Sequence, residues 1–226
     1  MVSPMLLHNL VVTVDGPAGA GKSTVAKKVA LALGIPYMDT GALYRALAYS
    51  LDAQGVLPEE SDVLLSSLRS ISVTLSENRV FVDAQDASDL IRTPHVGRLA
   101  SAYSALPAVR EKLLDIQREQ TLNGGLVADG RDMGTVVFPL APLKIFLTAS
   151  EDIRARRRWE ELKAKGDDLS FESVLEDMKR RDLADRERAC APLRKAEDAV
   201  VVDSSNLSVD QVVQVIVSLA LEVSHG

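Results

Sequence analysis

Short apolar runs and longer amphipathic segments follow one another along this chain. Each short run predicts a strand that is buried on both faces of a parallel sheet. The runs are Leu10–Val14, Ile35–Met38, Leu126–Ala128, Leu143–Leu147 and Val200–Asp203. Because segments of helical composition separate them, the order of elements predicts an α/β fold with a central parallel β-sheet flanked by helices.

Three of the helical segments have recognisable ends or neighbours. Lys22–Leu33 stops at Gly34, a frequent C-terminal signal. Thr40–Ala53 directly follows the second predicted strand. A long apolar-periodic segment, Val209–Val223, begins after Ser208, whose hydroxyl is suited to capping a helix N-terminus.

The pattern changes over residues 58–125. The alternating stretches ISVTL and RVFVD, separated by Ser76–Glu77–Asn78, predict a small hairpin. Long helical stretches follow, including Val109–Thr121. We expect a single domain over residues 1–226 in which 58–125 form an inserted lobe.

Composition and charge narrow the class of protein. The formal net charge of −6 argues against a general nucleic-acid-binding protein, which is usually basic. The single cysteine, Cys190, excludes an intrachain disulfide and a multi-cysteine zinc site. The apolar start of the chain, residues 1–16, has no basic n-region, so it predicts a strand and not a signal peptide. No window of about 18 apolar residues predicts a membrane span, and we expect a cytoplasmic monomer without a membrane or nucleic-acid partner.

A glycine-rich phosphate-binding motif follows the first predicted strand. Gly16, Gly21, Lys22 and Ser23 fit the pattern G-x-x-x-x-G-K-[ST], with a strand before it and a helix after it. Glycines let successive backbone amides turn toward phosphate oxygens, and the helix N-terminus adds partial positive charge. Lys22 is expected to reach the outer phosphates, and the Ser23 hydroxyl to bind Mg²⁺. The predicted triphosphate-binding residues are Gly16, Pro17, Ala18, Gly19, Ala20, Gly21, Lys22, Ser23 and Thr24.

Three further stretches make the pattern specific. They are MDTGALYR at 38–45, ADGRDMGTVVFP at 128–139 and RRDLADRERACAPL at 180–193. Together with GPAGAGKST, they resemble the cytidylate kinases of the bacterial type over nearly the whole chain. Thr40 departs from the serine that is common in that family, but it keeps the hydroxyl.

The resemblance implies a P-loop kinase fold with a nucleoside-monophosphate-binding insert and a short helical lid at residues 151–170. It implies that the γ-phosphoryl group of ATP passes to CMP or dCMP with Mg²⁺, giving CDP or dCDP and ADP. An acceptor that is itself a phosphate is already anionic, so it needs no general base. This agrees with the histidines His8, His95 and His225, none of which lies in a recognisable catalytic motif.

Arginines at helical spacing lie in the predicted lid and after it. Arg154, Arg157 and Arg158 share one helix face. The resemblance assigns Arg154 and Arg157 to the ATP phosphates and Arg158 to catalysis, whereas ion pairs with Glu161 and other neighbours are the alternative.

A second set, Arg181, Asp185 and Arg188, also shares one helix face. An ion-pair ladder along that face would explain the spacing. The resemblance instead assigns all three to the acceptor nucleotide and Arg181 also to the transferred phosphate.

Arg45 and Arg131 are the candidates for binding the phosphate of CMP, and Arg131 is also a catalytic candidate. A planar guanidinium can bind a phosphate through two hydrogen bonds. The resemblance adds Thr40. Asp129, at the end of a predicted core strand, has two open interpretations: it holds a metal-bound water, or it stabilises a turn.

Cytosine offers a donor amine beside an accepting ring nitrogen, and uracil offers the inverse pattern. A carboxylate accepts and an arginine donates, so Asp132 with Arg110 would match cytosine at both places. By resemblance these residues face the base, and Ser101 assists them. The alternatives are a solvated helix face for Ser101 and Arg110, and for Asp132 a pairing with Arg131 or a helix cap.

Two other functions compete. A kinase of the adenylate-kinase type would have a shorter acceptor lobe and a different glycine loop. A nucleotide-dependent switch would bind ATP without phosphorylating any nucleoside monophosphate, although the N-K-x-D motif of GTPases is absent from this sequence.

Overall fold

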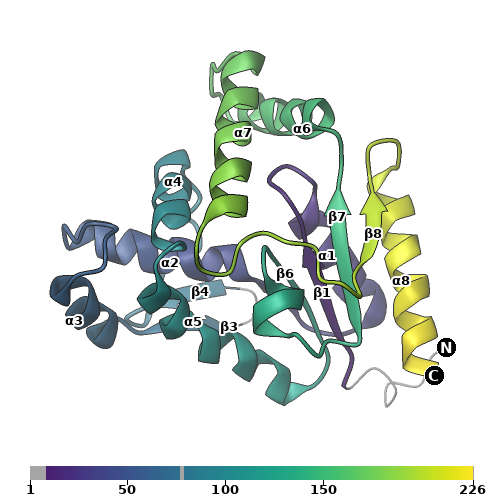
Figure 1. The fold of residues 1–226 in the computed structure, drawn as a ribbon, viewed down its shortest axis with the longest axis horizontal. Helices are drawn as coiled ribbons and strands as arrows, with labels where there is room; N and C mark the ends of the chain where they lie inside the picture. The colour runs from purple at the N-terminus through teal and green to yellow at the C-terminus, as the bar shows by residue number, and fades with distance from the viewer. Residues whose placement is uncertain (1–8, 77–78, 226) are drawn as a thin grey trace. The chain divides into compact units, whose positions relative to one another are not determined.

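The computed structural model describes residues 9–76 and 79–225 (Figure 1). Residues 1–8, which include His8, residues 77–78 between the two stretches of the predicted hairpin, and residue 226 lie outside the described residues. The chain forms two compact units: Met1–Tyr37 together with Asn123–Gly226, and Met38–Leu122. Each unit is described by itself.

A five-stranded sheet, counted over the described residues, has the order β2-β6-β1-β7-β8. Its strands are β1 (Val11–Asp15), β2 (Tyr37–Asp39), β6 (Leu126–Gly130), β7 (Leu143–Thr148) and β8 (Val200–Asp203). β1 pairs in parallel with β6 and β7, and β7 with β8, so the predicted parallel sheet is confirmed.

The order of the strands in this sheet indicates where a ligand would bind. From the central strand β1 the chain passes to β2 at one edge, and after β6 it reaches β7 on the other side of β1. Ligands of open α/β sheets bind at the carboxyl ends of the strands, where the strand order reverses in this way. The segment that follows β1 is the glycine-rich loop.

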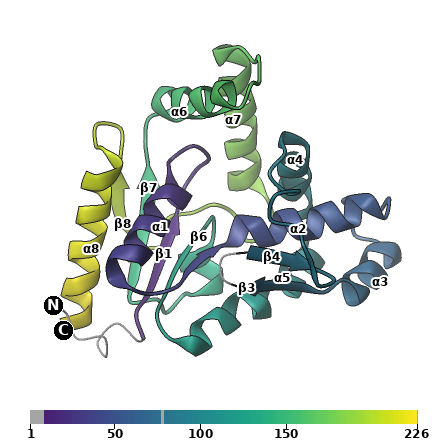
Figure 2. The ribbon, with the colours of Figure 1, turned by 180° about the vertical axis from the view of Figure 1, so that it is seen from behind.

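Two helices, α1 (Lys22–Leu33) and α8 (Val209–His225), pack against the sheet and against each other (Figure 2). Their apolar side chains join those of the strands in one core, which includes Val25, Val29, Val212 and Ile216. Ser208 caps α8 as predicted, because its Oγ accepts a hydrogen bond of 3.2 Å from the Gln211 amide.

A second helix pair, α6 (Glu151–Ala164) and α7 (Phe171–Glu187), has its own small core. Ala155, Leu162, Val174 and Met178 are buried there together with Ala18 of the glycine-rich loop. The short π-helix η2 (Met133–Val137) follows β6 in the same unit.

The second unit combines helices with a small antiparallel sheet. The helices are α2 (Thr40–Ala53), α3 (Asp62–Ser70), α4 (Pro94–Tyr103), α5 (Pro107–Glu119) and the short 3₁₀ turn η1 (Gln120–Asn123), which runs into the first unit. The strands are β3 (Val73–Ser76), β4 (Arg79–Val82) and β5 (Gln85–Asp86). β3 and β4 form the predicted hairpin, with Val73 opposite Val82.

Over the described part of the chain, none of the helices combines the length and the apolar character that crossing a membrane requires.

Candidate active site

The glycine-rich loop leaves β1 and enters α1 through backbone conformations that favour glycine. Gly19 and Gly21 have φ values of 72° and 88°, in the left-handed region. A Cβ on Gly16 would lie 2.0 Å from the Leu147 carbonyl oxygen, and one on Gly19 would lie 2.6 Å from Met178 Cε. Close contacts therefore favour glycine at positions 16 and 19, whereas at Gly21, with no atom within 4 Å, the left-handed backbone alone favours it.

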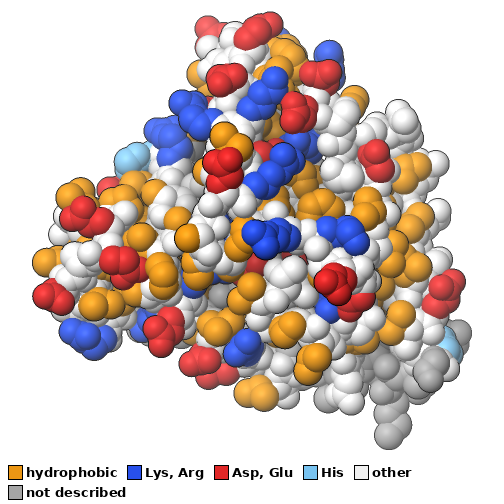
Figure 3. Space-filling view, in the orientation of Figure 1, with side chains coloured by type: hydrophobic (Ala, Val, Ile, Leu, Met, Phe, Trp, Pro, Cys, Tyr) orange, Lys and Arg blue, Asp and Glu red, His pale blue; other side chains and the backbone are white. Residues whose placement is uncertain are grey.

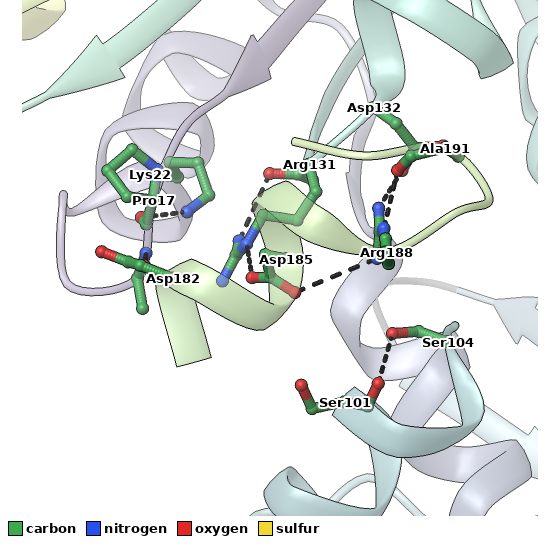
Figure 4. Close-up of polar contacts among 12 residues, drawn as sticks. Pro17, Lys22, Ser101, Ser104, Arg131, Asp132, Asp182, Asp185, Arg188 and Ala191 are labelled. Atoms are coloured by element: carbon green, nitrogen blue, oxygen red, sulfur yellow. Dashed lines mark hydrogen bonds and ion pairs between the residues drawn. The ribbon is translucent and has the colours of Figure 1, made fainter. Parts of the chain in front are cut away.

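Lys22 lies buried at the start of α1, and its Nζ donates a hydrogen bond of 2.8 Å to the Pro17 carbonyl (Figure 4). Burial lowers its pKa well below the usual value, and the positive charge of Arg131 lowers it further. A bound phosphate would supply the opposite charge that favours the ammonium form.

Asp129 lies within β6, and both of its carboxylate oxygens accept hydrogen bonds. Ser23 Oγ donates to one at 2.9 Å, and the Tyr37 hydroxyl donates to the other at 2.6 Å. The structure therefore places Asp129 beside the predicted metal ligand and inside a strand, which does not fit the turn-stabilising interpretation. A hydroxyl and a carboxylate are hard oxygen groups, of the kind that Mg²⁺ prefers.

Asp15, the last residue of β1, is a buried carboxylate in the same unit. Its two oxygens accept hydrogen bonds from the Met133 amide at 2.9 Å and the Gly134 amide at 2.8 Å. Burial raises the pKa of Asp15 to about 6, although the two amides oppose the rise.

Four charged residues form a cluster at the carboxyl end of β6 and the end of α7 (Figure 4). Arg131 Nε donates to Asp185 at 2.8 Å. Arg188 lies 4.0 Å from Asp185 and 3.5 Å from Asp132, and its Nε also donates to the Ala191 carbonyl at 2.7 Å. Burial would raise the pKa of Asp185, but Arg131, together with the positive charges of Arg181 and Arg188, holds that pKa below its usual value.

This cluster bears on two alternatives from the sequence. Asp185 pairs with Arg131 from another element, so the set 181, 185 and 188 is more than a ladder within one helix. Asp132 stands at the N-cap position of η2, where its side chain makes no capping hydrogen bond. Arg181 is exposed on α7.

Arg154 is buried on α6, and its spacing in the sequence did not predict this burial. Its guanidinium is buried and donates to the carbonyls of Ala149 and Ala18 at 3.1 and 2.8 Å, and to Asp182 at 2.5 Å. Asp182 also accepts from the Ala18 amide at 3.0 Å. The pair Arg154–Asp182 therefore clamps the glycine-rich loop, and direct binding of ATP by Arg154 stays a prediction without support from this geometry.

The other two lid arginines contact protein groups as well. Arg157 donates to the hydroxyl and the carbonyl of Ser204 at 2.9 and 2.7 Å. Arg158 pairs with Glu161 at 2.8 Å, which is the alternative that its spacing allowed. Figure 3 shows Lys and Arg side chains interleaved with Asp and Glu side chains over the exposed part of α7.

In the second unit, α2 positions one candidate for the acceptor phosphate. Asp39 caps the helix through a hydrogen bond of 2.9 Å from the Ala42 amide, and it also accepts from Arg45 at 3.0 Å. A Cβ on Gly41 would lie 2.9 Å from Arg45 Nη1, so glycine makes room for this pair. Thr40 is buried as the first residue of α2.

The same unit holds the candidates for the base. Arg110 is buried in α5, donates to the Ser104 carbonyl at 3.1 Å, and lies 5.5 Å from the Tyr44 ring centroid. It is therefore not on a solvated helix face. Ser101, on α4, is half-buried, and its carbonyl accepts from Ser104 Oγ at 2.9 Å.

The described histidines are both exposed. His95 lies 3.0 Å from Asp52 in the second unit, and His225 contacts the Leu221 carbonyl near the end of α8.

Residues 12–222 match the sequence model of one family, described as cytidylate kinase. The chain belongs to the cytidylate kinase family. The cytidylate kinase of Methylococcus capsulatus is 51% identical to it, covering 92% of this chain and 96% of that protein. The cytidylate kinase of Desulfitobacterium hafniense is 46% identical, covering 93% and 92%. A solved gluconokinase from Sinorhizobium meliloti 1021 has a TM-score of 0.50 at 15% identity, covering 96% of this chain and 95% of that one, and this likeness shows the P-loop kinase fold alone.

Three residues of this cytidylate kinase family member were missed from the sequence: Asp15, Tyr37 and Asp182. Their partners are 119, 92 and 164 positions away, and only the folded chain brings them together. Asp15 had one local signal, because a carboxylate at the end of an apolar strand is expensive to bury without a purpose.

Proposed function

We propose that this chain transfers the γ-phosphoryl group of ATP to CMP or dCMP, producing ADP and CDP or dCDP. The observation that carries the proposal is the match of residues 12–222 to the cytidylate kinase family. The arrangement of charges supports it, since phosphoryl transfer depends mainly on positioning and on neutralising negative charge.

On the donor side, we propose that the loop amides and Lys22 bind the ATP phosphates. Lys22 starts from a buried position with a lowered pKa, so a phosphate is a favourable partner for its ammonium group. Mg²⁺, when bound, neutralises charge on the phosphate oxygens. Ser23 would hold it directly, and Asp129 would accept from a water in its shell or from the Ser23 hydroxyl.

Arginines would neutralise the rest of the charge. We propose that Arg131 contacts both the acceptor phosphate of CMP and the transferred phosphoryl group, because Asp185 already fixes the direction of its guanidinium. Arg181 and Arg158 are proposed to join it from α7 and α6 when nucleotides bind. Arg154 would act on ATP through the loop that it clamps, and Arg157 through ATP contacts that the resemblance implies.

On the acceptor side, we propose that Arg45 and Thr40 bind the phosphate of CMP, with Arg188 and Asp185 binding its sugar or phosphate. Asp132, Arg110 and Ser101 are proposed to recognise the cytosine. The accepting carboxylate and the donating guanidinium match the two edge groups of cytosine and oppose those of uracil. A base that fails to pair would leave buried polar groups unsatisfied, which makes the discrimination large.

The test is an ADP-release assay with ATP, Mg²⁺ and each of CMP, dCMP, UMP, AMP and GMP. We expect rapid turnover with CMP and dCMP, slower turnover with UMP, and loss of activity when EDTA removes Mg²⁺. Preference for AMP would favour a kinase of the adenylate-kinase type. ATP binding without turnover on any monophosphate would favour a nucleotide-dependent switch. The monomeric state and the cytoplasmic location stay predictions.

A further inference from the structure

Asp15 connects the glycine-rich loop to the start of η2, and the two segments have different proposed tasks. It is the last residue of β1, directly before the glycine-rich loop that begins at Gly16. Its carboxylate binds the amides of Met133 and Gly134, which directly follow Arg131 and Asp132 in the chain. The buried side chain of Asp15 thus joins the glycine-rich loop, proposed to bind ATP, to the backbone that carries Arg131 and Asp132, both proposed to bind the acceptor.

The chemistry of this contact requires a carboxylate. Each oxygen accepts one amide hydrogen, at 2.9 and 2.8 Å, so both acceptors are used. An asparagine would place an NH₂ donor against one of the two amide donors and lose that hydrogen bond. Asparagine has nearly the same shape as aspartate, but it cannot replace aspartate here because it loses this hydrogen bond.

The surroundings hold the backbone of 133–134 closely. A Cβ on Gly134 would lie 3.0 Å from Thr13 Oγ1 on β1 and 3.1 Å from Lys144 Cδ on β7. Asp15 is 5% exposed, and burying an ionised carboxylate costs free energy that a neutral side chain would avoid. That cost is offset only in part by the two amides, so burial for stability alone does not explain a carboxylate at this position.

We propose that Asp15 is a positioning residue, which keeps the backbone of Arg131 and Asp132 in register with the glycine-rich loop. The inference rests on the proposed function, because that function gives Arg131 and Asp132 their roles toward the acceptor. Loss of one of the two hydrogen bonds would let the segment from Arg131 to Gly134 shift. Binding of ATP depends on the loop itself, so it would change little.

The test compares Asp15→Asn with Thr13→Val. Thr13 is on the same strand face and touches the same backbone, and within the described residues its hydroxyl has no hydrogen-bond partner. Thr13→Val is therefore a matched control that removes no hydrogen bond. For each variant, KM for CMP, KM for ATP and the ratio of kcat/KM between CMP and UMP would be measured.

For Asp15→Asn we expect KM for CMP to rise on the order of tenfold or more, because small misplacements of positioning groups have large kinetic effects. We also expect KM for ATP to stay within about twofold and the CMP-to-UMP ratio to fall. Thr13→Val should match the wild type in all three. Equal losses for CMP and ATP, or an unchanged ratio, would overturn the proposal and leave Asp15 a structural residue.

A measurement on the wild type keeps the inference testable if the variant does not fold. Amide hydrogen exchange should show Met133 and Gly134 protected as strongly as Val12 and Val14 inside β1. Exchange as fast as that of exposed loop amides would overturn the proposal. If the wild type fails to phosphorylate CMP, the proposed function fails, whereas the exchange result still decides whether Asp15 holds this backbone.

Discussion

At the scale of single residues, Lys22 is the side chain on which the donor site depends most. We predict that Lys22→Ala abolishes turnover and leaves the fold largely intact. The expected loss is several kcal/mol of transition-state stabilisation, because a cation placed at developing charge is worth that much in a site that excludes water. Steady-state kinetics and circular dichroism would measure activity and fold.

Lys28→Ala is the matched control, since Lys28 is on the same helix but is exposed and paired with Asp210 at 2.7 Å. Its kcat should stay within about twofold of the wild type, as surface ion pairs contribute little. Near-native kcat in Lys22→Ala would mean that the glycine-rich loop is not the catalytic site.

A second residue-scale prediction concerns base choice. Asp132→Ala should lower kcat/KM for CMP far more than for UMP, because alanine removes the acceptor that matches the cytosine amine. Kinetics with both substrates would give the ratio. Asp177→Ala removes an exposed carboxylate that pairs with Arg180 on α7, and it should leave the ratio unchanged. Equal losses for CMP and UMP would assign Asp132 to phosphate chemistry or to folding.

Asp15 also predicts a dependence of stability on pH. Its pKa is about 6 in the folded protein and 3.8 without burial, so the folded state binds a proton more readily. Lowering the pH from above 6 to about 4 should therefore stabilise the wild type relative to Asp15→Asn, by at most about 3 kcal/mol. Urea unfolding of both proteins at several pH values checks this. The quantity compared is the free energy of unfolding of the wild type minus that of Asp15→Asn. If this quantity stays constant, or decreases as the pH falls, the prediction is contradicted.

The sequence alone identified the glycine-rich loop because that motif is local and needs each residue type at its spacing. It could not predict the clamp on that loop. Arg154 has the same helical spacing as Arg157 and Arg158, yet it is 3% exposed and pairs with Asp182 on the next helix. Spacing shows which face a residue occupies, but not whether that face meets solvent or another helix.

At the scale of elements, α6 and α7 contain both a buried ion pair and a solvent-exposed one, and the two should differ in their contribution to stability. Arg154 and Asp182 are both buried, whereas Arg158 and Glu161 are half-exposed. We predict that Arg154→Ala lowers the free energy of unfolding by about 3–5 kcal/mol, because it leaves the Asp182 carboxylate buried without its positively charged partner. Arg158→Ala should change it by about 0–1 kcal/mol.

Urea unfolding followed by the fluorescence of Trp159, on α6 itself, would measure both values. Similar effects of the two substitutions would contradict the assignment of Arg154 to a buried clamp. A selective rise in KM for ATP in Arg154→Lys, which keeps the charge but not the forked geometry, would support its action through the glycine-rich loop.

Elements were predictable where apolar runs are continuous. The strand predicted at Val200–Asp203 and the helices at Lys22–Leu33 and Thr40–Ala53 have the observed bounds. β6 extends two residues beyond its predicted end, because Asp129 and Gly130 continue the pairing with β1 although neither favours a strand. The short strand β5 was missed, since its two residues are polar and exposed and carry no alternating pattern.

At the scale of the whole molecule, the residues proposed for the acceptor come from both compact units. Arg131, Asp132 and Arg188 belong to the first, whereas Arg45 and Arg110 belong to the second. The residues proposed for the acceptor are therefore spread over positions far apart in sequence. A resemblance that extends over nearly all of the chain could suggest this set, but no single motif could.

The central claim is that the γ-phosphoryl group reaches CMP and not water. A single-turnover reaction with ATP labelled in the γ position, Mg²⁺ and CMP would follow the label directly. We predict that the label appears in CDP at the rate at which ATP is consumed, with little label in inorganic phosphate. When CMP is omitted, the label should stay in ATP. Label that enters inorganic phosphate at the same rate with and without CMP would contradict the account.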